Sequence, residues 1–282
     1  MEEKNKENDS FLHFASTLTY FYEYICEGLM PLLGFDYRRS GMQKKMRGVV
    51  IYATKISDQK KIVEIFTDVT GCVSFVVRIA SGRRGGGNNI LYQPLSLVDF
   101  VADLKPGVNL HYLKDVQLSV PFLSIPFNVY KTTIAVFLAE FLHRALRIEY
   151  EDKPLFDFLT NSIQWFDETK DPVANFHLTF MIQISRFLGI YPNAEGYKKG
   201  YFFDLMNGCF CSQIPMHTFY LKPGEAKWVR YFMCMRYTNM NKFHLTRDQR
   251  MQCLNVIIDY YRLHIPGFPL LKSLDILKGL FD

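Results

Sequence analysis

Residues 47–79 decide the fold. They read RGVVIYAT at 47–54, KIVEIFT at 61–67 and CVSFVVRI at 72–79. These short runs are rich in β-branched and aromatic side chains, which are typical of strands because they pack well on a pleated surface. Turn residues separate the runs at Ser57-Asp58 and at Thr70-Gly71. The pattern therefore predicts three consecutive strands joined by tight turns.

Two more strand-like runs, LSLVDFV at 95–101 and LHYLKDVQL at 110–118, follow a glycine-rich stretch and are joined by a Lys105-Pro-Gly turn. No helix-length pattern interrupts most of residues 46–118. Five short strands in that span describe a small closed or nearly closed barrel. The five-stranded OB-fold is the common nucleic-acid binder among such barrels, so we expect an OB-fold domain at residues 42–120.

After Pro121 the apolar period becomes helical. Apolar residues recur at spacings of three and four over Ile134–Ile148 and over Leu155–Phe166. Asp171-Pro172 is typical of an N-cap followed by proline at the first helical position. This pair predicts a helix that runs to about Leu188 and stops at Gly189.

A capping-box sequence, Thr246-Arg-Asp-Gln249, predicts the start of a later helix. Four apolar residues line one face of it before Pro266-Gly267: Met251, Leu254, Ile258 and Tyr261. Residues 197–222 show little periodicity and are expected to form an irregular connector. The sequence thus predicts an α+β protein, with an N-terminal five-stranded OB-fold β-barrel followed by an all-α C-terminal domain at residues 121–282.

The composition indicates a folded protein with a mild excess of positive charge. Apolar residues make up 49% and aromatic residues 16% of the chain, which supports a packed core rather than disorder. The many rings serve either dense packing or the stacking of bases. The net charge is +5, and residues 42–120 hold eleven basic against six acidic side chains. This excess fits a polyanionic partner, although many ordinary soluble proteins have as much.

The first 41 residues differ from the rest. The stretch Phe11–Phe35 is apolar, but His13, Glu23 and Glu27 interrupt it, and it lacks a basic leader and a small-residue cleavage site. A membrane-spanning helix would have to bury two carboxylates at great cost. We therefore expect residues 1–41 to be a dispensable N-terminal extension, with a helix packed on the domain and a membrane anchor as the alternatives. A cytoplasmic protein is expected.

Signatures of catalysis are missing from the sequence. It contains no Gly-x-Ser-x-Gly, no Walker loop, no His-Glu-x-x-His and no aspartate-rich metal motif, so we expect a protein that is not an enzyme. His143, His177 and His264 fall within helical patterns and are expected to be satisfied helix histidines. Three aspartates are expected to be solvated charges at helix ends: Asp157, Asp167 and Asp171.

Metal binding is not expected either. The six cysteines are too few for a disulfide scaffold in a chain of 282 residues, and they are typical of the reduced cysteines of a cytosolic protein. Only Cys209-Phe-Cys211, with His217 six residues further on, hints at zinc. A zinc site needs four ligands, usually in paired hooks, and no second hook lies nearby in the sequence.

Three motifs in the same order resemble the RecO family. The first is the run 47–67, in which a strand, a Ser-Asp turn and a second strand end in Phe-Thr. The second is the Gly82-Arg-Arg loop that leads to LYQPLSL at 91–97, and the third is the closing HIPGFPLLKSL at 264–274. The resemblance covers residues 42–282, and details such as ANFHL at 174–178 are most similar to the Bacteroidetes branch.

The resemblance implies a recombination mediator of the RecF pathway, acting in DNA damage repair and DNA recombination. Such a protein would bind single-stranded DNA, anneal complementary strands and, with RecR, help to load RecA onto strands coated by single-strand-binding protein. It would be cytoplasmic and associate with the nucleoid during repair. The basic residues of the barrel are the implied DNA contacts, each with a solvated surface charge as the alternative: Arg47, Lys60, Lys61, Arg78, Arg83 and Arg84.

Two further expectations come with the resemblance. The helical domain would dock the acidic, phenylalanine-ending tail of single-strand-binding proteins, and the helix 172–188 is a candidate, unless its apolar residues are core: Phe180, Ile184 and Phe187, near Arg186. Many members of the family also carry two Cys-x-x-Cys hooks in the connector. This chain offers only Cys209 and Cys211 there, so we expect no structural zinc.

Two rival classes remain. A generic OB-fold protein that binds RNA or tRNA would share the barrel, but it would need neither the helical half nor the Leu-Lys-Ser ending. Glycines at 82–87 surround Arg83 and Arg84, and this loop either closes on a nucleic-acid backbone or is a solvated connector. A nuclease built on the helical domain would need clustered acidic residues for its metal ions, and the sequence shows no such cluster.

Overall fold

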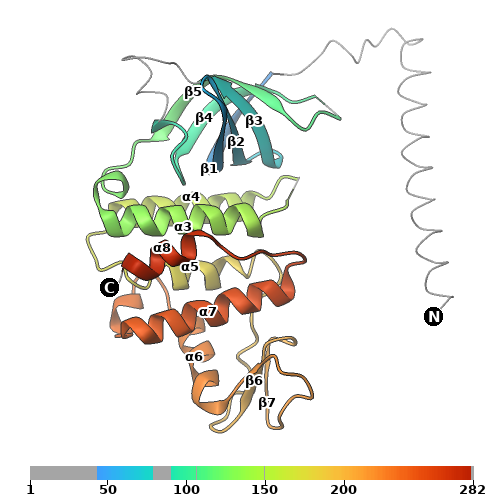
Figure 1. The fold of residues 1–282 in the computed structure, drawn as a ribbon, viewed down its shortest axis with the longest axis vertical. Helices are drawn as coiled ribbons and strands as arrows, with labels where there is room; N and C mark the ends of the chain where they lie inside the picture. Colours follow the sequence, from blue (N-terminus) through green and yellow to red (C-terminus); the bar gives the residue numbers. More distant parts are fainter. Residues whose placement is uncertain (1–42, 79–89, 106, 149, 281–282) are drawn as a thin grey trace, which may run out of the picture. The chain divides into compact units, whose positions relative to one another are not determined.

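The computed structural model describes residues 43–78, 90–105, 107–148 and 150–280 (Figure 1). Arg83 and Arg84, which the sequence places at a DNA contact, lie outside these ranges. Lys44–Ala102 and Gly107–Asp282 form one compact unit, which holds the barrel and the helices. The second unit, Met1–Gln43 with Asp103–Pro106, is described only at residues 43 and 103–105.

The first part of the chain is a closed five-stranded barrel, so the OB-like barrel expected from the sequence is confirmed. Its strands follow the order β1-β2-β3-β5-β4 around the barrel. They are β1 (Gln43–Ser57), β2 (Lys60–Thr67), β3 (Gly71–Arg78), β4 (Leu97–Asp103) and β5 (His111–Val120). The barrel closes between β1 and the start of β4, where Val50 N–H donates to Ser96 O and Leu95 N–H donates to Val50 O, both at 2.9 Å.

Alternate side chains fill the barrel. Val63 of β2 lies opposite Phe75 of β3, and the Phe75 ring meets the Phe100 ring edge-on at 5.3 Å between centroids. All three side chains are buried. A Cβ on Gly48 would fall 2.1 Å from Ile65 Cγ2, so only glycine lets β1 approach β2 this closely.

The barrel packs directly on the first two helices of the following domain. The rings of Phe66 and Phe156 lie 6.4 Å apart, and both side chains are buried. Gly71, at φ 72°, leaves room for the chain that follows α3 (Val129–Ala145), because a Cβ added at this position would lie 2.2 Å from Ile148 O. Cys72 N–H donates to the same carbonyl at 2.7 Å. One hydrophobic core therefore continues from the barrel into the helices.

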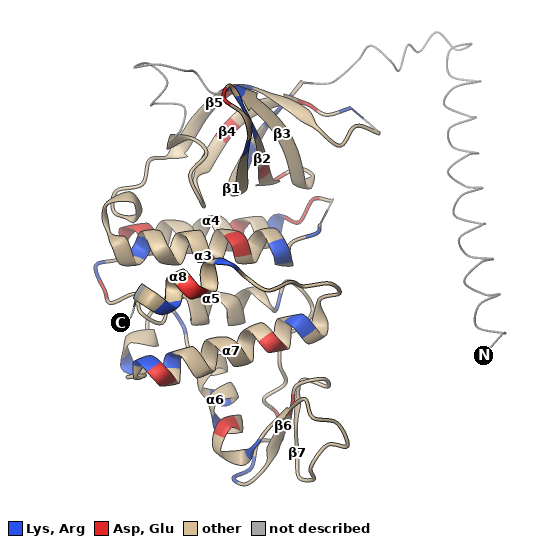
Figure 2. Cartoon of the chain, viewed as in Figure 1, with Lys and Arg blue, Asp and Glu red and all other residues tan. Residues whose placement is uncertain are grey.

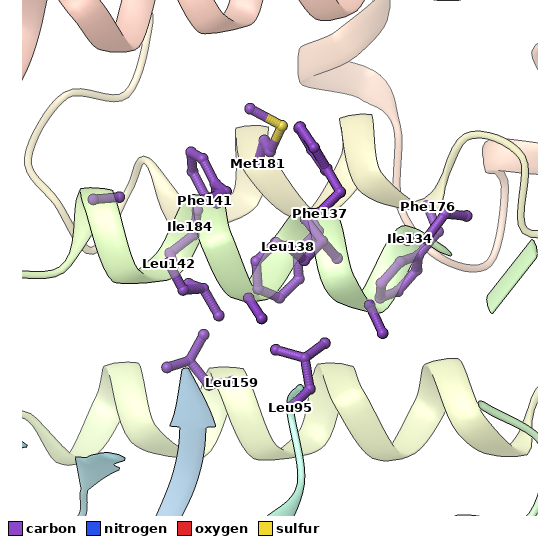
Figure 3. Packing of buried hydrophobic residues seen from close by; sticks show 14 of the residues in the cluster. Leu95, Ile134, Phe137, Leu138, Phe141, Leu142, Leu159, Phe176, Met181 and Ile184 are labelled. Atoms are coloured by element: carbon purple, nitrogen blue, oxygen red, sulfur yellow. The ribbon is translucent and has the colours of Figure 1, made fainter. Parts of the chain in front are cut away.

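In the helical part, other helices pack on two sides of α3 (Figure 3). Its helices are α3 (Val129–Ala145), α4 (Lys153–Glu168), α5 (Phe176–Ile184), α6 (Pro223–Cys234), α7 (Arg247–His264) and α8 (Ser273–Leu280), with short 3₁₀ turns at Ile125–Phe127 and Met240–Lys242. In Figure 3, Leu95 and Leu159 point toward α3 from one side, and Met181 lies on the other. The predicted capping box at Thr246 is confirmed, because Thr246 N–H donates to Gln249 Oε1 at 2.9 Å and Gln249 N–H donates back to Thr246 Oγ1 at 3.3 Å.

The helix predicted from Pro172 to Leu188 is wrong at both ends, because α5 spans only Phe176–Ile184. Its start is fixed by Asn175, whose Nδ2 donates to Met240 O at 3.1 Å and to Phe243 O at 2.8 Å. After Ile184 the backbone hydrogen bonds change to the 3₁₀ type, in which an N–H donates to the carbonyl three residues earlier, as Phe187 N–H does to Ile184 O at 2.9 Å. Long-range contacts therefore override the local Asp171-Pro172 signal.

The connector 197–222 is not irregular. It contains a three-stranded sheet in the order β7-β6-β8, formed by β6 (Phe202–Asp204), β7 (Cys209–Cys211) and β8 (Tyr220–Leu221). Strands of three and two residues are too short to show a period in the sequence. The sheet has its own small core with α6 and α7, made of Phe203, Leu205, Leu221, Ala226, Val229 and Tyr260. The C-terminal domain is therefore helical but not all-α.

Asp167 is not the solvated charge that its position at a helix end suggests. It is buried and holds the linker between barrel and helices. Its carboxylate accepts N–H bonds from Leu123 at 2.6 Å, Ser124 at 2.9 Å and Ile125 at 2.8 Å. The buried Lys131 ammonium donates to the carbonyls of Asp167 at 2.9 Å and Thr169 at 2.8 Å. Burial lowers the pKa of Lys131, and the nearby Asp167 charge opposes that shift.

Candidate nucleic-acid interface

Two of the predicted basic residues lie side by side on the barrel. Lys60 of β2 and Arg78 of β3 are direct cross-strand partners, and both are exposed. Because side chains alternate along a strand, Ile62 and Val76 follow them on the same face, again as partners. Val63 and Ile65 point the other way, into the barrel. The face that carries Lys60 and Arg78 is therefore the outer one.

The neighbouring strand β5 adds a ring and a third cation to this face. β5 runs parallel to β3, and Tyr112 is the partner of Val76. The Tyr112 side chain is 67% exposed, which is unusual for a ring on a strand that has partners on both sides. Lys114, which is exposed, lies two residues beyond Tyr112 on β5, just as Arg78 lies two residues beyond Val76 on β3. We call Lys60, Ile62, Val76, Arg78, Tyr112 and Lys114 the outer barrel face.

The cations of the outer barrel face have no acidic partner. Among the described residues, no carboxylate forms an ion pair with Lys60, Arg78 or Lys114. Like charges placed directly across a pair of strands are destabilising, so the fold tolerates an unfavourable contact between Lys60 and Arg78. Basic residues beside an exposed ring are the arrangement with which single-strand binders hold phosphates and bases. Figure 2 shows basic residues on the barrel strands.

The other end of the same face is closed by α3. The Tyr52 and His143 rings stack at 4.2 Å between centroids. His143 Nδ1 also lies 3.2 Å from Glu64 Oε2, outside hydrogen-bonding geometry. His143 is thus part of the junction between barrel and helix. The end of the face that carries Lys60, Arg78 and Tyr112 is the more exposed one.

Two of the other predicted DNA residues, Arg47 and Lys61, are not part of this face, and Arg83 and Arg84 lie outside the described residues. Arg47 binds Asp68, with Arg47 N–H to Oδ1 at 2.9 Å and Nε to Oδ2 at 3.1 Å. Its guanidinium also lies 5.3 Å from the centroid of the Phe156 ring in α4, so it serves the junction with the helices. Lys61 is partly buried and points to the inner side of β2, opposite Val77.

Sequence reasoning missed Tyr112 and Lys114. Both lie in the run that predicts β5, but their position beside Arg78 depends on the parallel pairing of β3 with β5. These two strands are separated by β4 in the chain. The alternation of exposed and partly buried residues at the start of β5 marks their face, but no local pattern tells which strand lies next to it.

Cys209 and Cys211 are the connector residues that hint at zinc in the sequence. Cys209 and Cys211 lie on one short strand, and no group of three His, Cys, Asp or Glu in the described part of the chain is placed to hold a metal. Asp204, close to His217 at 3.3 Å, accepts N–H bonds from Met206 and Asn207 and one from the Asn207 side chain. Although burial raises the pKa of Asp204, these bonds and His217 outweigh it and lower the pKa.

The proposed groove on α5 needs correction. Phe180 and Ile184 are completely buried in the core, so they cannot line an open surface. Phe187 is 36% exposed but packs on the Phe158 ring at 4.9 Å. Arg186 stacks over Tyr191 at 4.3 Å and donates to its hydroxyl at 2.7 Å. The apolar spacing in this helix therefore reflects core packing.

Two family models match the chain in the order of its two parts. Residues 42–122 match "Recombination protein O N terminal", and residues 126–274 match "Recombination protein O C terminal". The chain belongs to the recombination protein O (RecO) family. The resemblance found in the sequence is thereby confirmed.

Three similar proteins carry the name "DNA repair protein RecO". The protein of Phocaeicola vulgatus is 46% identical over 241 residues, which cover 86% of this chain and 100% of that protein. That of Bacteroides fragilis is 45% identical over 242 residues, with coverage of 86% and 100%. That of Flavobacterium johnsoniae is 35% identical over 244 residues, also with coverage of 86% and 100%. In the described residues, no helix combines the length and apolar character needed to cross a membrane.

Proposed function

We propose that this RecO-family protein acts in DNA repair as a recombination mediator without enzymatic activity, and that single-stranded DNA binds the outer barrel face. The observation that supports this most directly is that Lys60 and Arg78, which are cross-strand neighbours without an acidic partner among the described residues, lie beside the exposed Tyr112 ring. Phosphates would follow the cations while bases stack on the ring, each stack contributing about 1–3 kcal/mol. Such binding does not depend on base sequence and weakens steeply with salt.

The wider role follows the family. We propose that the protein anneals complementary strands and cooperates with RecR to load RecA onto strands coated by single-strand-binding protein, working in the cytoplasm at the nucleoid. The match over both family models supports a shared role for the barrel and the helices. A generic RNA- or tRNA-binding OB-fold protein would not need the second half of this match.

Replacing Lys60 and Arg78 together by alanine should weaken single-stranded DNA binding about tenfold or more, because tenfold corresponds to only ~1.4 kcal/mol. The slope of log affinity against log salt should flatten by roughly 0.7 for each phosphate that the variant no longer neutralises. The matched control is Lys55→Ala with Lys153→Ala, which removes two cations already paired with Asp58 and Asp157. Titration of a labelled oligonucleotide at several salt concentrations measures both quantities.

The wild type and the same variant also distinguish a recombination mediator from an RNA-binding protein. The wild type should anneal complementary strands coated by single-strand-binding protein, and Lys60→Ala with Arg78→Ala should anneal them slowly. An unchanged affinity and salt slope in this variant would remove the outer barrel face as the DNA site. Tighter binding to single-stranded RNA than to DNA, with no annealing, would favour the RNA-binding alternative.

We propose a docking site other than α5 for the acidic tail of single-strand-binding protein. A pocket of about 500 Å³ lies where the linker and the start of α3 meet the segment after α4. It is lined by Tyr130, Ile134 and Val173, with the exposed Lys170 at its edge. Three further apolar side chains before and at the start of α3 are strongly exposed: Leu123, Phe127 and Val129. The N-terminus of α3 also favours a carboxylate.

Lys170→Glu should weaken binding of an acidic, phenylalanine-ending peptide about tenfold, because a like charge at the pocket rim repels it and each ~1.4 kcal/mol is a factor of ten. Fluorescence anisotropy with a labelled peptide measures the effect. Lys153→Glu, on the neighbouring helix α4 but outside the pocket, is the control. Equal weakening by both variants would indicate a general charge effect and exclude this pocket as the docking site.

A further inference from the structure

A second surface rich in cations and rings lies on α6 and on the chain just before β6. Residues 197–236 contain six Lys or Arg residues and two Asp or Glu residues, and ten of these forty residues are aromatic. α6 packs on α5 and on the small sheet, whereas the outer barrel face lies on β2, β3 and β5. The two surfaces therefore share no element. Figure 2 shows basic residues on α6 and in the chain beside the small sheet.

Cations and rings are already paired on this second surface. The Arg230 guanidinium lies 5.2 Å from the centroid of the Tyr197 ring. Lys198 Nζ lies 5.9 Å from the centroid of the Tyr201 ring, and Lys227 Nζ lies 5.3 Å from the centroid of the Trp228 ring. Half of the cation–ring pairs in the described residues therefore occur in this short part of the chain.

These cations have no acidic partner among the described residues. Asp204 is buried and its oxygens accept the bonds from Met206 and Asn207 described above. Glu225 accepts the Lys222 N–H at 3.3 Å at the start of α6. None of the ion pairs in the described part of the chain includes Lys198, Lys227 or Arg230. The positive charge of the surface is thus available to an anion.

One side of α6 carries the surface and is exposed, and the other side is buried in a core. Lys227, Arg230 and Tyr231 are spaced by three and four residues, so they lie on one side of α6, and all three are exposed. Tyr231 is 44% exposed. The opposite side of the helix, with Ala226 and Val229, is buried in the core of the small sheet.

We propose that this α6 surface, formed by Tyr197, Lys198, Lys227, Trp228, Arg230 and Tyr231, is a second binding site for single-stranded DNA. A cation that lies beside a ring offers a contact for a phosphate next to a stacking platform for a base. An acidic peptide would use the cations but not the rings, so nucleic acid fits the surface better. This inference rests on the proposed DNA-binding function of the barrel.

A second site explains how one chain promotes annealing. Two complementary strands must be held close together before they pair, and holding both on one protein replaces a bimolecular encounter by an intramolecular one. With the outer barrel face on one strand and the α6 surface on the other, the parts of the two strands that extend beyond these sites are kept close enough to meet. Binding that is indifferent to sequence at both sites lets any complementary pair be brought together.

The number of short oligomers bound by each chain tests the inference. The probe is a labelled deoxythymidine oligomer of about 10 nucleotides, within the ~4–16 nucleotide footprint of an OB fold. The wild type should bind two oligomers, and Lys227→Ala with Arg230→Ala should bind one. This variant should anneal complementary strands about tenfold more slowly, because two cations that neutralise phosphates are removed. Arg262→Ala with Lys278→Ala, which removes two cations paired with Asp259 and Asp275, should behave as the wild type.

Each outcome separates the two sites. If Lys227→Ala with Arg230→Ala still binds two oligomers at an unchanged melting temperature, the α6 surface is not a DNA site. If the wild type binds one oligomer and only Lys60→Ala with Arg78→Ala abolishes that binding, the barrel site stands and the second site is excluded. If only the α6 variant loses binding, the barrel proposal fails and this one holds. A loss of binding to an acidic peptide, with both oligomers retained, would assign the α6 surface to a protein partner instead.

Discussion

Asp167→Ala should lower the free energy of unfolding by about 3 kcal/mol or more, because each buried donor left without its acceptor costs ~1–3 kcal/mol. Three backbone N–H groups, those of Leu123, Ser124 and Ile125, lose the carboxylate that they share. The buried Lys131 ammonium also loses the negative charge that opposes its desolvation. The melting temperature should fall by roughly 10 °C, since 1 kcal/mol corresponds to ~2–4 °C in a chain of this size.

Thermal and urea unfolding of Asp167→Ala measure this loss, and Asp157→Ala is the matched control. Asp157 lies on the same helix, but its side chain is 47% exposed and it pairs only with Lys153. Removal of an exposed pair of this kind changes stability by less than ~1 kcal/mol. Equal melting temperatures for the two variants would mean that the linker does not depend on Asp167.

The barrel could be predicted because its strands carry local signals. Runs of β-branched residues separated by Ser57-Asp58 and Thr70-Gly71 give both the strands and the turns that join β1, β2 and β3. Local signals do not predict which side of each strand meets the helices. Arg47 has the sequence context of a free surface cation, yet the fold places it between Asp68 and the Phe156 ring. That placement depends on a helix more than a hundred residues later in the sequence.

The candidate site could be predicted only in part, for the same reason. Lys60 and Arg78 lie on strands joined by a short turn, so their pairing follows from local register. Tyr112 and Lys114 reach the same face through the parallel pairing of β3 with β5. In α5 the spacing of Phe180 and Ile184 is the same for a core helix and for an exposed groove, and only burial separates the two.

The closing Leu-Lys-Ser run, which resembles the RecO family, has a structural explanation in Glu140 of α3. Leu271 is buried in the core. Glu140 Oε1 accepts the Lys272 N–H at 2.9 Å, and Oε2 accepts the Ser273 N–H at 2.7 Å and the Ser273 hydroxyl. These are N–H groups at the start of α8, where a carboxylate is favoured. Glu140 therefore fixes α8 against α3.

Glu140→Gln should lower the free energy of unfolding by about 2 kcal/mol at neutral pH, because hydrogen bonds to a charged group contribute ~1.5–3 kcal/mol. Burial alone would raise the pKa of Glu140, but the bonds from Ser273 and Lys272, together with Arg144, outweigh it and lower the pKa. A carboxylate with a depressed pKa in the folded state stabilises that state above the unfolded pKa of ~4.3. Its contribution is lost as the pH falls through the folded value.

The difference in stability between wild type and Glu140→Gln should therefore be constant from pH 7 to about 5 and should shrink below the unfolded pKa of ~4.3. Urea unfolding of both proteins across this range measures it. Ser273→Ala removes the hydroxyl donor but keeps both backbone bonds, so it should cost less at neutral pH. In acid the protonated glutamate should be as poor an acceptor for these N–H groups as glutamine, so the difference in stability should disappear. A difference that persists unchanged in acid would mean that the charge of Glu140 is not what holds α8.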